Sequence, residues 1–291
     1  MSKQVANGYT FEWCLLEAYR RQGVPVIRNV GREGTLLKHV NKSPEIVEQS
    51  MPIATALIKK LIELEPKTIS VTAVGGKEVA DLRCQRDGAT DFDISAKHGS
   101  GEVYGPRFSL KGLHYLPVRG EVPSDYEYAA GVKHLQEEIS ELSNRFQTWK
   151  RVDAENRQIR FDLSDKFRDL VSGVFKRLDK QYVPQVLVGL LGSNACYIVE
   201  SKDGGEYGLI TPLNFDGVLS YGKKLQSPTY VKHVDDVEEV SHAVDLTLMP
   251  GHWTLRYRVH TRVKEVEPGS VGMSVTLRSN PAEHGRIHVR P

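Results

Sequence analysis

The sequence predicts an α/β (α+β) fold in which a mixed sheet is flanked by helices and followed by a β-rich C-terminal portion. Three observations lead to this prediction. Apolar residues recur at helical spacing in residues 11–19 and 43–66, a strand–turn–strand pattern occupies residues 79–98, and strand-like texture prevails from residue 195 onward. We expect three regions, which can join into one compact domain: residues 1–120, a helical region at 121–193 and a β-rich portion at 194–291.

Length and composition indicate an ordinary globular protein. The 291 residues, 40% hydrophobic and 26% charged, can bury a sizeable core. The net charge of +2 excludes a uniformly basic protein, so any nucleic-acid surface must be a local patch. The three cysteines contain no CxxC pair, which favours buried free thiols over zinc. The polar start and the lack of an apolar run of about 18 residues lead us to expect a cytoplasmic protein without signal peptide or membrane helix.

The N-terminal elements are read from apolar spacing and capping residues. Residues 11–21 predict a helix that Thr10 can cap, which places Glu12 in the first turn. Residues 24–41, with two glycines, indicate a loop or short strands. A second helix begins after Ser43 with a proline in its first turn and ends at Pro66, and residues 69–74 predict a strand before the hairpin.

The hairpin at residues 79–98 turns at Asp87-Gly88. Side chains alternate between the two faces of a strand, so Asp81 lies on the polar face of the first strand. If residues 86–90 form the turn, Asp81 lies opposite Ser95. Two or three carboxylates and one lysine then converge on one side of the hairpin. The second strand contributes four polar side chains to this face: Asp91, Asp93, Ser95 and Lys97.

These residue types suit phosphodiester hydrolysis. Clustered carboxylates bind a hard cation such as Mg²⁺, which keeps several waters and binds phosphate oxygens. Such a metal stabilises charge on the phosphate and lowers the pKa of its water. A lysine two residues beyond the acidic position can contact the attacking water or a phosphate oxygen. The alternative is a solvated hairpin face without chemistry.

The spacing resembles the PD-(D/E)xK nuclease core, with Asp81 as the first acid and residues 95–97 (Ser-Ala-Lys) in the place of (D/E)-x-K. Ser95 departs from the carboxylate usual there, and Asp93 or Asp91 can supply the missing metal ligand. Asp93 is favoured because it lies one strand repeat from Ser95, roughly 6.6 Å, whereas Asp91 lies about twice as far. The resemblance also implies a glutamate from the first helix beside the metal, for which Glu12 is the first candidate and Glu17 the next. The alternative for Glu12 is a local role in the first turn, where a carboxylate suits the helix dipole.

Four segments together resemble the HaeIII-type restriction endonuclease family. They are N-G-Y-T-F-E at 7–12, D-I-S-A-K-H at 93–98, L-P-V-R-G-E-V-P-S-D-Y-E-Y at 116–128 and W-T-L-R-Y-R-V-H at 253–260. They follow in the family's order over nearly the whole chain. The resemblance implies a type II endonuclease that cuts double-stranded DNA at a short palindrome, GGCC in the family's namesake. Its cofactor would be one or two Mg²⁺ ions, with Mn²⁺ able to substitute.

Two partners follow from a palindromic target. A two-fold homodimer would present the same surface to each half-site, although some restriction enzymes act as monomers. The host, a bacterium or archaeon, must protect its own sites, so we also expect a cognate DNA methyltransferase that makes no direct contact with this protein.

The middle of the chain indicates scaffold helices. Residues 124–149 predict one helix, and residues 150–160 a polar turn or frayed helix. A further helix is expected to be capped by Ser164, and residues 184–191 form a short apolar segment.

Residues 253–264 predict a strand with one apolar and one basic face. No acid interrupts the basic face until Glu265, and its side chains are Arg256, Arg258, His260, Arg262 and Lys264. Such a stripe suits DNA phosphates and guanine edges. Arg258 and His260 match the family's R-x-H positions, and we expect Arg258 to contact guanine. The alternative is the solvent-exposed face of an antiparallel sheet.

The glycine-punctuated stretch after Lys97 supplies three further candidates for DNA contact: His98, Arg107 and Lys111. Glycines allow close approach of the backbone to a ligand, and an arginine can bind a phosphate with two hydrogen bonds. The alternative is a flexible connection.

Two other functions fit the same residues. One is a DNA-repair or structure-specific nuclease with the same core, which differs in the strand and site selectivity of cleavage. The other is a DNA-binding protein whose site has lost activity, for which Ser95 is the one hint. Magnesium-dependent digestion of plasmid DNA separates the second from both nucleases.

Overall fold

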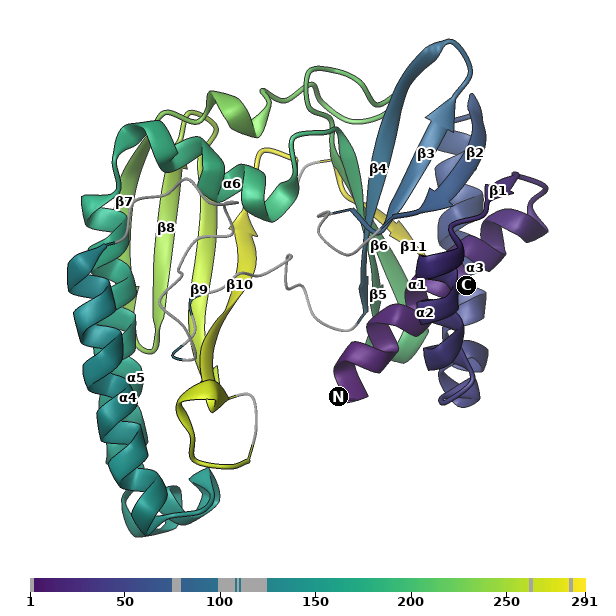
Figure 1. The fold of residues 1–291 in the computed structure, drawn as a ribbon. Coiled ribbons are helices and arrows are strands. Elements are labelled where there is room, and N and C mark those ends of the chain that lie inside the picture. The colour runs from purple at the N-terminus through teal and green to yellow at the C-terminus, as the bar shows by residue number, and fades with distance from the viewer. Residues whose placement is uncertain are drawn as a thin grey trace. The chain divides into compact units, whose positions relative to one another are not determined.

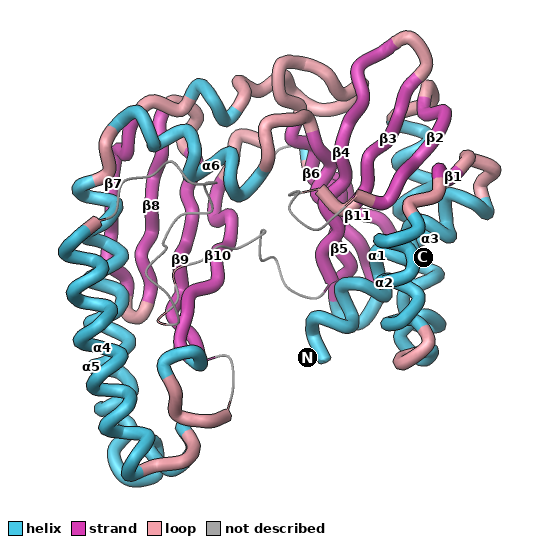
Figure 2. The backbone as a smooth tube through the Cα atoms, viewed as in Figure 1, coloured by secondary structure: helices cyan, strands magenta, loops and turns pink. Residues whose placement is uncertain are grey.

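The computed structural model describes residues 3–74, 80–98, 108, 110, 125–261, 264–282 and 285–291. The chain divides into two compact units (Figure 1). The first comprises residues 1–101, 192–228 and 281–291, and the second residues 102–191 and 229–280. The described part contains six α-helices, a seven-stranded mixed sheet and a four-stranded antiparallel sheet, which confirms the mixed α/β class (Figure 2).

The first unit is built on the seven-stranded sheet, with strand order β1-β2-β3-β4-β5-β6-β11. Its strands are β1 (Val26–Ile27), β2 (Thr68–Ala73), β3 (Leu82–Arg86), β4 (Ala89–His98), β5 (Cys196–Lys202), β6 (Tyr207–Leu213) and β11 (Ile287–Val289). Strands β1 and β2 are parallel, as are β4 and β5, and the other neighbours are antiparallel. Strand β5 follows β4 by about a hundred residues in sequence, yet the two are adjacent in the sheet.

Helices α1 (Lys3–Arg21), α2 (Val30–Val40) and α3 (Pro44–Leu64) belong to this unit. Helices α1 and α3 contact each other and the sheet, and their apolar stripes are buried, including Leu15 and Leu57. Pro44 occupies the first turn of α3 as predicted, and Pro52 lies inside the helix.

Two expectations for this region are wrong. Helix α1 begins upstream of Thr10, which is fully buried inside it, because the polar residues before Phe11 continue the helix in spite of Gly8. In the segment expected to be a loop or short strands, Val26–Ile27 is a short strand, but residues 30–40 are helical, because Asn29 caps α2 by accepting a hydrogen bond from the Arg32 amide.

A buried ion pair joins three parts of the first unit. The Arg86 guanidinium donates to Glu65 at 2.9 Å and to the carbonyl of Val218 at 2.7 Å. The Glu65 carboxylate also accepts from the Tyr197 hydroxyl and from both the amide and hydroxyl of Ser220. Each oxygen of this fully buried carboxylate is therefore hydrogen-bonded, which is the condition for keeping a buried charge. The network fixes the turn of the β3–β4 hairpin, where Gly88 has a positive φ of 62°.

The second unit pairs a helical hairpin with the four-stranded sheet. Its helices are α4 (Tyr126–Arg145), α5 (Trp149–Arg177) and α6 (Val183–Leu191), and its strands β7 (His233–Val240), β8 (Ala243–Met249), β9 (Trp253–Thr261) and β10 (Val271–Ser279) follow the order β10-β9-β8-β7. Helix α5 lies against β7, β8 and β9. Four rings form the core between them, with centroids 4.9–5.7 Å apart: Phe108, Tyr128, Phe175 and Tyr257.

The expected helix start at Ser164 is wrong. Helix α5 already begins at Trp149, and Ser164 lies inside it with its hydroxyl donating to the Arg160 carbonyl. The backbone leaves helical geometry at Asn156, whose side chain accepts from the Gln158 amide. The polar residues 150–160 therefore form two helical segments around a kink.

Candidate functional site

The β3–β4 hairpin has the predicted register. Leu82 pairs with Ile94 and Arg83 with Asp93, so the register continued by one residue sets Asp81 opposite Ser95. The Asp81 amide donates to the Ile94 carbonyl at 2.9 Å. Leu82 and Cys84 are buried, and Tyr19 of α1 lies 3.7 Å from the Cys84 sulfur, so this face meets the helices. Alternation assigns the opposite face to the polar residues.

Asp81 lies at the bend that leads into β3. Its Oδ2 accepts a hydrogen bond from the Ala96 amide of β4 at 2.7 Å. Its Oδ1 lies 3.9 Å from the Arg32 guanidinium, and the side chain is 24% exposed. One carboxylate oxygen is thus held by the backbone of the second strand, while the other faces a cation.

Glu12 lies within α1 and is almost completely buried. Arg32 binds its carboxylate with two hydrogen bonds, from Nε at 2.9 Å and from Nη2. Burial, and then the neighbouring Asp81 carboxylate, raise the pKa of Glu12 to about 8, while Arg32 and Lys97 act in the opposite direction. Glu12, Asp81, Lys97 and Arg32 therefore lie within electrostatic reach of one another, and we call these four residues the Asp81 cluster.

Arg32 is a member of this cluster that the sequence did not single out. It occupies the first turn of α2, where the Asn29 side chain caps the helix and also donates to the Ala73 carbonyl of β2 at 2.9 Å. The Arg32 guanidinium stacks 4.9 Å from the centre of the Tyr9 ring. The capping residue Asn29 could have predicted a helix that begins here and includes Arg32. The two glycines around Arg32 instead favoured a loop.

Asp93 is on the predicted face of β4, but its carboxylate already has partners. Arg83 donates to Oδ1 at 3.0 Å, and the Asn194 amide donates to Oδ2 at 3.0 Å. Asp93 and Ser95 are buried, whereas Asp91 is exposed. The structure thus brings Glu12 and Asp81 together, and it pairs Asp93 with Arg83 and Asn194.

His98 lies on the opposite face of β4 from Lys97. Its ring is edge-on to Phe11 of α1, with centroids 5.7 Å apart, and its Nε2 is 3.4 Å from the Ser50 hydroxyl of α3. Burial lowers the pKa of His98. The ring therefore packs between helix and sheet, which gives no support to the predicted DNA contact. Two other predicted contacts, Arg107 and Lys111, lie outside the described residues, as does Arg262.

Strand β9 alternates as predicted. Trp253, Leu255, Tyr257 and Val259 are buried, whereas Arg258 is exposed and Arg256 and His260 are half-buried. Within β9 no acid interrupts the basic face, but the neighbouring strand supplies one. Asp245 of β8 lies directly opposite Arg256 and accepts a hydrogen bond from its Nε at 2.6 Å. Glu238 of β7 lies opposite Asp245 in turn, so charge changes sign across this sheet.

A comparison with known protein families decides the general assignment. The HaeIII restriction endonuclease family is matched over residues 41–281, which is most of the chain. The chain belongs to the HaeIII restriction endonuclease family. Membership implies a type II restriction enzyme that cleaves DNA. No curated protein matches the chain, and no solved structure does either.

Restriction endonucleases of this kind typically use Mg²⁺, and the Asp81 cluster fits such an ion. Mg²⁺ is bound in proteins by one or two carboxylates, with water and substrate phosphates completing the shell. Glu12 and Asp81 supply two carboxylates; burial first, and then repulsion from Asp81, raise the pKa of Glu12. A divalent cation beside them would relieve this repulsion. Among the described residues no group of three acidic, histidine or cysteine side chains is arranged to hold a metal ion.

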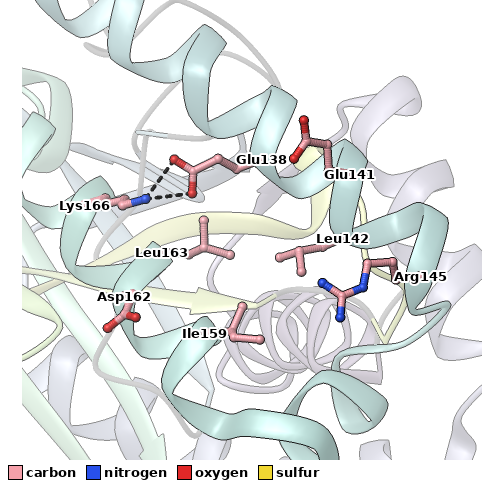
Figure 3. A pocket seen from close by; sticks show the side chains of 8 residues that line it. All are labelled: Glu138, Glu141, Leu142, Arg145, Ile159, Asp162, Leu163 and Lys166. Atoms are coloured by element: carbon pink, nitrogen blue, oxygen red, sulfur yellow. Dashed lines mark hydrogen bonds and ion pairs between the residues drawn. The ribbon is translucent and has the colours of Figure 1, made fainter.

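A pocket between α4 and α5 is lined by charges of both signs (Figure 3). Lys166 bridges both oxygens of Glu138 at 2.8 Å. Leu142, Ile159 and Leu163 point toward one another from the two helices and form its apolar floor. Three acids and two bases line this pocket, and an excess of negative charge is unsuited to a phosphate. Within the described parts of this HaeIII-family chain, no helix has the length and apolarity that crossing a membrane requires.

Proposed function

We propose that this protein is a type II restriction endonuclease that hydrolyses phosphodiester bonds at a short palindromic site in double-stranded DNA, G·C-rich as in the family's namesake. The observation that carries the proposal is the convergence of Glu12, Asp81 and Lys97 at the start of the β3–β4 hairpin. Acid, acid and lysine from these elements match the residue types of a PD-(D/E)xK site. The family match over residues 41–281 supports DNA as the substrate.

Glu12 is proposed to supply the carboxylate that Ser95 lacks. The sequence favours Asp93, but Arg83 and Asn194 already bind both of its oxygens. Moving Asp93 to a metal would leave the Arg83 charge without its partner. Glu12 is also bound through both oxygens, by Arg32, so a metal there would likewise displace an arginine. What favours Glu12 is its place beside Asp81, since burial and then the Asp81 carboxylate raise its pKa.

Each residue of the Asp81 cluster has a role in this proposal. Asp81 and Glu12 would hold Mg²⁺, which when bound supplies positive charge to the reacting phosphate and lowers the pKa of water. Lys97 would hold a phosphate oxygen or orient the attacking water through its ammonium group. Arg32 neutralises Glu12 and, with its helix start anchored on β2, fixes the carboxylate position. Glu12 is buried, so water is excluded around its carboxylate, which strengthens the electrostatic interactions of this group.

The β9 surface is proposed to bind DNA, because Arg258 and His260 lie on the face of the sheet that α5 leaves uncovered. A palindromic target favours a two-fold homodimer that presents this strand once to each half-site. The protein would act in the cytoplasm of a bacterium or archaeon, beside a methyltransferase that protects the host's own sites.

Digestion of supercoiled plasmid with and without Mg²⁺ tests the proposed function. Wild-type protein should give discrete fragments with Mg²⁺ and none with a chelator, and Lys97→Met should give none in either condition. Lys60→Met is the matched control, because Lys60 is an exposed α3 lysine that pairs with Glu63. Cutting that persists with chelator, or full cutting by Lys97→Met, would contradict the proposal.

A further inference from the structure

The pair formed by Arg256 and Asp245 has a specific geometry. The two residues are directly opposite each other on β9 and β8. Arg256 donates from Nε to Oδ1 at 2.6 Å and from Nη2 to Oδ2. The carboxylate thus binds one edge of the guanidinium with two parallel hydrogen bonds, which fixes both the position and the plane of the group.

This arrangement leaves another edge of the same guanidinium available. Of its five N–H groups, Asp245 accepts from two, and the described residues provide no hydrogen-bond partner for Nη1. The Arg256 side chain remains 26% exposed. The edge formed by Nη1 and Nη2 can therefore donate two hydrogen bonds to a ligand, which is the pattern that guanine O6 and N7 accept.

The charge of the pair favours a base over a phosphate. Asp245 cancels the charge of Arg256, and Glu238 adds a further negative charge on the next strand. An arginine with a carboxylate bound to it has little electrostatic attraction for phosphate, whose binding depends on charge neutralisation. Its directional hydrogen bonds to a base edge are retained, because they depend on geometry.

Arg258 provides the contrast on the same face of β9. Its neighbours across the sheet are Ala243 on β8 and Ser274 on β10, so no acid lies beside it in the described part of either strand. Its side chain is exposed. An exposed cation whose described cross-strand neighbours are uncharged suits a phosphate, whereas the sequence favoured this residue for guanine.

We propose that Asp245 is a positioning residue that holds Arg256 to read a guanine in the target site, while Arg258 contacts a phosphate. This inference rests on the proposed function, since it assumes that the β9 surface meets the DNA that the enzyme cleaves. It adds a specificity role for an acid on the neighbouring strand.

The test is duplex affinity without Mg²⁺ for four variants: Asp245→Asn, Arg256→Lys, Arg258→Ala and the control Glu239→Gln. The probes are a duplex carrying the mapped cleavage site, a duplex with one G·C pair of that site replaced, and a random duplex. Glu239 is a suitable control because it also forms an ion pair, with Lys176, but on the helix-covered face of the same sheet. Thermal melting of each variant reports on folding.

We expect Asp245→Asn and Arg256→Lys to lower the preference for the cognate duplex by about 5- to 150-fold, the range of one good bidentate base contact. The salt slope should stay unchanged in Arg256→Lys, which keeps the charge, and should steepen in Asp245→Asn, which leaves the Arg256 charge uncompensated. Arg258→Ala should weaken all duplexes equally and lower the salt slope by about one unit. A double variant, Asp245→Asn with Arg256→Lys, should discriminate no worse than Arg256→Lys alone, because both changes remove the same contact.

Two outcomes would overturn the inference in distinguishable ways. In the first outcome, the wild type prefers the cognate duplex and Arg258→Ala behaves as expected. If Asp245→Asn and Arg256→Lys then keep the wild-type preference for the cognate duplex, the inference fails and the proposed function stands. If digestion in Mg²⁺ yields no single cleavage site from which to build the cognate duplex, the proposed function fails and the inference falls with it.

Discussion

Replacement of Asp81 separates its proposed catalytic role from its structural one. In the wild type the Ala96 amide donates to Asp81 Oδ2 at 2.7 Å. Asp81→Asn keeps the size of the side chain and a carbonyl oxygen that can accept this hydrogen bond. Asp81→Ala removes this acceptor as well as the charge. Both variants should lose cleavage, because a carboxylate needed for metal binding is gone. A loss of several kcal/mol of transition-state stabilisation corresponds to a rate decrease of at least about 10³-fold.

The two variants should differ in stability. The hydrogen bond from the Ala96 amide to a charged acceptor contributes about 1.5–3 kcal/mol, and Asp81→Ala should lose that amount in the free energy of unfolding. Asp81→Asn should lose less than about 1 kcal/mol, because a neutral acceptor remains. Binding to the target duplex without metal should be retained or tightened in both, since a negative charge facing the phosphate has been removed.

The assay is plasmid cleavage in Mg²⁺ together with urea unfolding of the same preparations. Asp87→Asn is the control, because Asp87 is an exposed carboxylate in the turn of the same hairpin. Cleavage by Asp81→Asn at the wild-type rate would refute the assignment of Asp81. Equal destabilisation by Asn and Ala would refute the argument from the Ala96 hydrogen bond.

Three further predictions follow from the described contacts. In plasmid digests Glu12→Gln should abolish cleavage, while Asp93→Asn and Asp91→Asn should retain most of it. Cleavage by Glu12→Gln together with its loss in Asp93→Asn or Asp91→Asn would show that the metal ligand lies on β4. Glu65→Gln should lower the free energy of unfolding by about 3–5 kcal/mol in urea titrations, because it leaves the buried Arg86 charge uncompensated. A loss below about 1 kcal/mol would contradict the role of this ion pair. The three buried cysteines should resist a thiol reagent at pH 8 in the native state and react after unfolding. Burial raises the pKa of Cys14 to about 12, so only about one Cys14 thiol in 10⁴ is ionised at pH 8. Rapid labelling of the native protein would be inconsistent with the structure.

Features set by local geometry were predictable from the sequence. Strand alternation fixes which side chains share a face of the hairpin. Asp81 lies opposite Ser95 as predicted, but not through the expected five-residue turn: Arg86 pairs with Ala89, and a bulge between Cys84 and Arg86 sets the register. The same alternation correctly assigned the two faces of β9.

Features that depend on distant partners were not predictable in this way. Asn194 binds Asp93 across 101 positions of sequence because β5 joins the sheet beside β4. Asp245 meets Arg256 only because the β8–β9 hairpin has a particular register. Arg32 was hidden for a different reason, since two glycines lowered the helical propensity of a segment whose cap and packing outweigh them. Periodicity describes a strand or helix by itself, whereas these contacts depend on its neighbours.

The ends of plasmid DNA digested in Mg²⁺ show whether this protein cuts at one site. We expect the ends from many molecules to fall at one position within a single short sequence that reads the same on both strands. Such a result needs a nuclease that reads bases and cuts both strands at a fixed register. Ends scattered over unrelated sequences, or confined to branched or damaged structures, would contradict the claim that this protein is a type II restriction endonuclease.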